Sequence, residues 1–111
     1  MKKHKPSKMR NVRTTIDGIK FDSKKEANRY SELKLLQKAE SISGLQIKPA
    51  FPISINDHNI CKYIADFSYT DINGQVIVED VKGRKTGPAW QMFRLKQKLM
   101  KAIHGIEVKV I

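Results

Sequence analysis

The sequence is organised around residues 76–83, which read Val-Ile-Val-Glu-Asp-Val-Lys-Gly. The run begins with β-branched apolar residues and is typical of a strand that is largely buried on both faces. Because side chains alternate along a strand, Asp80 and Lys82 should project side by side, on the face shared with Val76 and Val78. Removing either charge from water is costly. The stretch therefore predicts either a charged strand end that reaches solvent or a functional acid–base pair.

The composition describes a basic chain with one modest core. It has 111 residues, 40% of them hydrophobic, and its 22 Lys and Arg residues against 11 Asp and Glu give a net charge of +11. Such a surplus favours a polyanionic partner, most often nucleic acid. No apolar run approaches the length of a membrane span and no signal peptide is visible, so we expect no membrane partner. The single cysteine, Cys61, excludes an internal disulfide and indicates a reducing, cytoplasmic setting.

The chain divides into a basic arm and one domain. Residues 1–13 are dominated by Lys and Arg and are interpreted as a flexible arm, which either contacts the partner or is a solvated tail. Residues 14–111 form the domain, which opens with a predicted hairpin around the Asp17-Gly18 turn. Ser23 and Glu26 have the spacing of a capping box and predict a helix to about residue 39, with Gly44 as its terminator.

Glu26 has two interpretations that the sequence leaves open. It closes the capping box, and it also shares one helix face with Tyr30 and Leu33, the face that should meet the core. A carboxylate at the edge of a buried face is well placed to help hold a cation. Capping and metal binding are compatible roles.

Two strand-like segments follow this helix. Residues 45–55 contain two prolines, which suggest an edge strand or a bulge. Residues 61–69 are apolar and aromatic but are interrupted by Asp66, a residue type that is rarely buried unless it is paired or coordinated. The Asn-Gly pair at 73–74 predicts a tight turn, so the strands that carry Asp66 and Asp80 should form an antiparallel hairpin and bring the two carboxylates together.

A second helix is predicted from Pro88 to about Ile103, with Gly105 ending it. We expect residues 106–111 to form a final half-buried strand. The element order α-β-β-β-α-β predicts an α/β (α+β) fold, a mixed sheet flanked by helices. The apolar stripe of the second helix, expected in the core, comprises Ala89, Met92, Leu95, Leu99 and Ala102 or Ile103.

The candidate site consists of Glu26, Asp66, Asp80 and Lys82. Carboxylate oxygens are the ligands that Mg²⁺ prefers, and a bound cation activates water and stabilises charge on a phosphate. A neighbouring lysine can orient the attacking water or stabilise the transition state. Metal-assisted phosphodiester hydrolysis therefore accounts for the acidic residues and the basic surface together. The histidines are scattered, with no zinc-binding spacing.

Three segments carry a resemblance to a known superfamily: Asp17–Ala27, Tyr63–Phe67 and Glu79–Gly83. Asp66 followed by Asp80-Val81-Lys82 resembles the core of the PD-(D/E)xK nucleases. The segments look more specifically like a small phage-associated family, similar to phage endonuclease I-type junction resolvases and transposon end-cutting nucleases. The resemblance implies a restriction-endonuclease-like fold and a phage- or prophage-encoded nuclease acting in the bacterial cytoplasm.

The resemblance also implies residue roles. Glu26 is the helix carboxylate of the site, Asp66 and Asp80 are ligands of Mg²⁺ or Mn²⁺, with the Val81 carbonyl as an additional ligand, and Lys82 is the catalytic lysine. Lys48, which precedes Pro49, departs from the family pattern, where a glutamine is expected. The implied DNA contacts are Lys96 and Gln91 on the second helix, to which the basic loop adds Arg84 and Lys85.

The sequence thus predicts a metal-dependent endodeoxyribonuclease, with branched DNA such as a Holliday junction as the favoured substrate. Cutting a junction usually requires two active sites, which is consistent with a symmetric homodimer. The rival is a non-catalytic phage DNA-binding protein, for which the charge of +11 suffices. A third alternative is an RNA-binding or protein-contact module that kept the fold and lost the chemistry. The acid set separates them, because a pure binder gains nothing from carboxylates that face its DNA.

Overall fold

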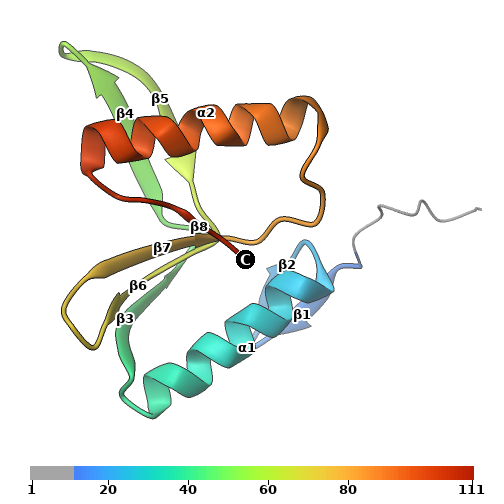
Figure 1. The fold of residues 1–111 in the computed structure, drawn as a ribbon. Coiled ribbons are helices and arrows are strands. Elements are labelled where there is room, and N and C mark those ends of the chain that lie inside the picture. The colour runs from blue at the N-terminus through green and yellow to red at the C-terminus, as the bar shows by residue number, and fades with distance from the viewer. Residues whose placement is uncertain (1–11) are drawn as a thin grey trace, which may run out of the picture.

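The fold is mixed α+β, as predicted, in a computed structural model that describes residues 12–111. A four-stranded sheet of order β3-β6-β7-β8 is joined by two two-stranded ribbons, β1-β2 and β4-β5. Helices α1 (Lys24–Lys38) and α2 (Gly87–His104) lie on opposite sides of the sheet (Figure 1). The strands are β1 (Thr14–Ile16), β2 (Ile19–Phe21), β3 (Ile42–Ile47), β4 (Ala50–Ile55), β5 (His58–Ile64), β6 (Phe67–Asp71), β7 (Val76–Asp80) and β8 (Lys109–Val110).

Two predictions concern the basic arm and the absence of a membrane span. The predicted basic arm lies, up to residue 11, outside the described residues. Within residues 12–111, neither helix combines the length and the apolar content that crossing a membrane requires.

The N-terminal elements form as predicted, with one exception. The β1-β2 hairpin turns at Asp17 and Gly18, which have φ angles of 54° and 77°, left-handed values that Asp-Gly pairs favour in tight hairpins. Helix α1 is capped by Ser23, whose hydroxyl accepts the Glu26 N–H at 3.0 Å. The prediction that Gly44 terminates this helix is wrong. Gly44 lies inside β3 with a φ of 65°, where the β3–β6 register shifts and a bulge needs a left-handed residue.

Strand β7 is one of the two interior strands of the four-stranded sheet. It pairs antiparallel with β6, which confirms the predicted hairpin, and parallel with β8. Val78, Glu79 and Asp80 are buried, whereas Val76 at the start of the strand is 55% exposed. Burial on both faces is therefore confined to the half of β7 that ends in the acid–base pair.

The two long strands predicted at 45–55 and 61–69 are each divided in two, so the expected order α-β-β-β-α-β contains too few strands. The divisions face each other. The Lys48 N–H donates to the Asp66 carbonyl at 2.9 Å, and the Ala65 N–H donates to the Pro49 carbonyl at 3.0 Å. One break thus interrupts both strands, between the β3–β6 ladder and the β4–β5 ribbon.

This break, which we call the strand break (residues 48–49 and 65–66), directs the two halves of each strand into different cores. Phe67 and Tyr69 pack with α1 in one buried cluster, whereas Tyr63 and Ala65 pack with α2 in the other. In an uninterrupted strand, residues separated by two would face the same side of the sheet. The chain therefore passes from one core to the other at Asp66, which belongs to neither.

The predicted core stripe of α2 is wrong in part. Met92 and Leu95 are 53% and 51% exposed, and Phe93 and Met100 are the buried residues. Ala89 and Ala102 are also exposed. The apolar residues that complete the core are Trp90, Leu99 and Ile103. Apolar residues occupy more than one side of this helix, so periodicity did not select the face that packs under β4 and β7.

The C-terminal end follows the prediction more closely. Gly105 caps α2 in the left-handed conformation, with a φ of 68°. Strand β8 is short, but Val108 is buried and Ile106 and Val110 pack against the α2 core, as the alternating pattern indicated.

A buried ion pair fastens α1 to the sheet. Glu79 is fully buried on the face of β7 opposite Asp80, and the Arg29 guanidinium donates to its two carboxylate oxygens at 2.7 Å and 2.6 Å. The Tyr69 hydroxyl also donates to this carboxylate. A buried carboxylate is tolerated when it is paired and hydrogen-bonded in this way.

We expect Arg29→Met to lower the free energy of unfolding by about 3 kcal/mol, because it leaves the Glu79 carboxylate buried without its counter-charge. Urea denaturation followed by circular dichroism measures the change. Glu32→Ala is the matched control, since Glu32 is the exposed partner of the same arginine at 3.0 Å and its loss should cost less than about 1 kcal/mol. Equal losses in the two variants would contradict the assignment.

Candidate active site

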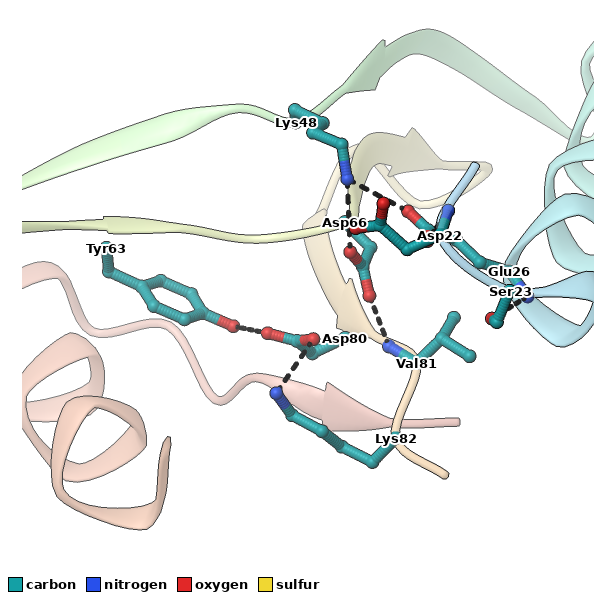
Figure 2. A network of polar contacts seen from close by, with 9 residues as sticks. All are labelled: Asp22, Ser23, Glu26, Lys48, Tyr63, Asp66, Asp80, Val81 and Lys82. Atoms are coloured by element: carbon teal, nitrogen blue, oxygen red, sulfur yellow. Dashed lines mark hydrogen bonds and ion pairs between the residues drawn. The ribbon is translucent and has the colours of Figure 1, made fainter. Parts of the chain in front are cut away.

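Of the four residues predicted to form the site, Asp66, Asp80 and Lys82 line one cleft where β7 ends, beside the strand break. Glu26 lies next to them and is linked to Asp66 through Lys48 (Figure 2). Asp80 and Lys82 come from the end of β7 and the residues after it, and Glu26 comes from the first turn of α1. Asp66 stands one position beyond the last paired residues of the β6–β7 ladder, Phe67 and Glu79, and therefore faces Asp80. The predicted meeting of the two aspartates is thus produced by the hairpin.

Asp80 is held from two sides. One carboxylate oxygen accepts the hydroxyl hydrogen of Tyr63, and the other lies 3.3 Å from the Lys82 ammonium. That ammonium also lies 4.3 Å from the centre of the Phe93 ring, close enough for a cation–π interaction. Burial, followed by the hydrogen bond to Asp80 and the charge of that carboxylate, raises the pKa of Tyr63 far above its usual range, so this hydroxyl remains a donor. These contacts orient the acid–base pair that the sequence predicted.

Asp66 is the electrostatically unusual group of the site. Burial and then the charge of Asp80 raise its pKa to about 8, although the Val81 N–H, which donates to it at 2.7 Å, acts in the opposite direction. Two carboxylates placed side by side disfavour each other's ionised form. The metal-free site therefore favours the protonated form of Asp66, and a bound cation would favour its ionised form.

Glu26 lies at the edge of the site, where its contacts are those of a helix cap and of an ion pair. It occupies the third position of α1, where its N–H is capped by Ser23, and one carboxylate oxygen accepts the N–H of Asp22 at 3.3 Å. The other oxygen lies 3.1 Å from the Lys48 ammonium, which is also 3.8 Å from Asp66. Figure 2 shows Lys48 reaching between Glu26 and Asp66 from the opposite side of the site.

Lys48 and Tyr63 are site residues that the sequence analysis did not assign. Lys48 departs from the family pattern, and this departure is the signal that the sequence carries for it. Tyr63 lies inside one of the quoted segments but has the spacing of an ordinary core residue. Its hydroxyl reaches Asp80 only because β5 leaves the sheet at the strand break.

Of the four predicted DNA-contact residues, one lines the cleft that contains the candidate site. Lys96 lines a cleft of about 360 Å³ together with Asp66, Asp80 and Lys82. Arg84 and Lys85 are exposed on the loop between β7 and α2, close in sequence to Lys82. Gln91 is exposed on α2 and does not line this cleft.

The residues present fit a metal site of few protein ligands. Among the described residues, no group of three or more Asp, Glu, His or Cys side chains is close enough to hold a metal ion. Mg²⁺ usually retains several waters and is bound through one or two carboxylates, so Asp66 and Asp80 suffice as hard oxygen donors. The Asp66 and Asp80 carboxylates disfavour each other's ionised form, and a bound cation would relieve this repulsion.

Comparison with known proteins identifies the family. The chain belongs to the family described as Protein of unknown function (DUF1064), whose family model matches residues 6–110. No curated protein and no solved structure matches the chain.

We expect the stability of the metal-free protein to fall as the pH rises from about 4 to about 8. Folding raises the pKa of Asp66 from 3.8 to about 8, so in this window the folded state binds a proton that the unfolded chain has released. The slope contributed by one proton is at most about 1.4 kcal/mol per pH unit. Urea denaturation at several pH values in EDTA measures it. Asp66→Asn should flatten the dependence, and an unchanged slope would show that Asp66 ionises normally.

Proposed function

We propose that this protein is an endodeoxyribonuclease that depends on Mg²⁺ or Mn²⁺ and hydrolyses phosphodiester bonds. The observation that carries the proposal is the adjacent pair Asp66 and Asp80, lying with Lys82 in a cleft of a chain whose net charge is +11. Acidic groups within a basic protein are unfavourable for binding a polyanion unless they serve a metal or a proton transfer.

Each residue of the cleft has a role in this proposal. Asp66 and Asp80 would hold the metal ion, together with the Val81 carbonyl. When bound, Mg²⁺ would supply a Lewis acid that activates water and stabilises the charge developing on the phosphate. Lys82 is fixed between Asp80 and the Phe93 ring. It orients the attacking water and stabilises the negative charge that develops on the phosphate. Tyr63 acts as a positioning residue, because it holds the far oxygen of Asp80.

The surroundings of the cleft suit a DNA strand. Lys62 and Lys96 line it beside Lys82, and the exposed Arg84 and Lys85 extend the basic surface along the adjoining loop. The resemblance of the sequence to PD-(D/E)xK junction resolvases supports branched DNA as the substrate and a homodimer that presents two sites. The same resemblance supports a phage or prophage origin and action in the bacterial cytoplasm.

The rival function is DNA binding without catalysis, for which the net charge alone is sufficient. DNA binding without catalysis does not explain why Asp66 and Asp80 lie together in the cleft. Two carboxylates would repel the phosphates of bound DNA, and Tyr63 and Lys82 would orient a group that performs no reaction.

The direct test is cleavage of labelled four-way junction, splayed and duplex DNA in Mg²⁺, Mn²⁺ or EDTA. We expect metal-dependent cutting of the junction, reduced at least about 100-fold in Asp80→Asn and in Lys82→Ala, since each removes a group that acts at the reacting phosphate. Denaturing gels of the end-labelled strands give the rates.

Matched controls lie outside the cleft. Asp57→Asn alters an exposed turn aspartate, and Lys101→Ala alters an exposed lysine on the far end of α2, so both should cut at the wild-type rate. Tight binding without cutting in either metal would overturn the nuclease proposal and favour the rival.

Removal of residues 1–13 should weaken DNA binding and flatten its dependence on salt, because fewer phosphate contacts release fewer counterions. Fluorescence anisotropy between about 50 mM and 200 mM salt measures the slope. Binding of Mn²⁺ should be unaffected, since no predicted metal ligand lies in the arm. An unchanged salt slope would identify the arm as a solvated tail.

A further inference from the structure

Glu26 is placed at the site, but both of its carboxylate oxygens already have partners. One of its oxygens accepts the Asp22 N–H at 3.3 Å, and the other is paired with the Lys48 ammonium at 3.1 Å. The side chain is 6% exposed, so it has little freedom to turn elsewhere. A helix carboxylate that served as a metal ligand would instead need an oxygen available to the ion.

The Lys48 ammonium lies between the Glu26 and Asp66 carboxylates. It lies 3.1 Å from Glu26 and 3.8 Å from Asp66, and so bridges a carboxylate of α1 and one of the strand break. The backbone N–H of Lys48 donates to the Asp66 carbonyl. This hydrogen bond holds the Lys48 Cα directly opposite Asp66.

The backbone of Lys48 is also held in an uncommon conformation. Its φ is 54°, in the left-handed region that residues other than glycine seldom adopt, and Pro49 follows it. Such a conformation persists where the surrounding structure imposes it, and residues of this kind gather at functional sites. Here the paired break in two strands imposes it and directs the lysine into the acidic cluster.

We propose that Lys48 is a built-in cation of this site, so that Glu26 pairs with the lysine rather than with metal and the site takes one divalent ion, at Asp66 and Asp80. The inference rests on the proposed nuclease function and specifies its metal requirement. Lys48 is a positioning residue, since it acts through the carboxylates.

The local charge balance supports a single ion. Three carboxylates, Glu26, Asp66 and Asp80, face two ammonium groups, Lys48 and Lys82. These five groups carry a net charge of −1, which one divalent ion already exceeds, so a second ion would only add to the positive charge. Without Lys48, Glu26 and Asp66 would face each other with no counter-charge between them, an arrangement that favours a second cation.

The test is the number of Mn²⁺ ions bound per chain, measured on the full-length protein by isothermal titration calorimetry and by electron paramagnetic resonance of the free ion. We expect one ion for the wild type, a loss of affinity of at least tenfold in Asp80→Asn, and a change of less than threefold in Glu26→Gln. Lys48→Met should bind a second ion, and Lys48→Arg should bind one.

The second ion in Lys48→Met should disappear in the double variant Lys48→Met/Glu26→Gln, because Glu26 would be its ligand. Circular dichroism of each variant establishes that it is folded. One ion in folded Lys48→Met, two ions in the wild type, or equal losses in Glu26→Gln and Asp80→Asn would overturn the role of Lys48. Absence of any Mn²⁺ binding by the wild type would instead overturn the proposed function and, with it, this inference.

Discussion

The structure depends on the strand break, where Lys48-Pro49 and Ala65-Asp66 interrupt two paired strands at the same level. Two backbone hydrogen bonds cross the break and keep the strands together while the β4–β5 ribbon leaves the sheet. The ribbon covers α2, and the remaining halves cover α1, so the two divided strands contribute side chains to both cores. Polar side chains are tolerated at the crossing because neither core encloses it, and it is there that Asp66 and Lys48 reach the end of β7.

The end of β7 shows how neighbouring carboxylates acquire different roles. Glu79 points toward α1, where Arg29 and Tyr69 satisfy it completely and exclude other ligands. Asp80 points to the other side, where Tyr63 and Lys82 orient it toward a cleft. Both are buried carboxylates, and the difference between a structural and a chemical role comes from what each face of the sheet brings to it.

Local patterns predicted a large part of the fold. The capping box at Ser23, the Asp17-Gly18 and Asn73-Gly74 turns and the left-handed Gly105 act over a few residues, so sequence spacing defined them. The stripe of α2 failed because the helix has apolar residues on several sides, and packing selected Phe93 over Met92. The division of the two long strands was missed for a related reason, since residues 63–69 keep one alternating pattern while the backbone changes cores.

The sequence by itself determined the two helices, the hairpin that joins Asp66 to Asp80, and the pairing of Asp80 with Lys82, because these follow from alternation and turn chemistry over short distances. Tertiary structure alone decided that Lys48 stands between Glu26 and Asp66 and that Tyr63 reaches Asp80. Those contacts join residues from separate elements across a break in the sheet. Their geometry depends on how two cores pack on opposite faces, and no local pattern encodes that arrangement.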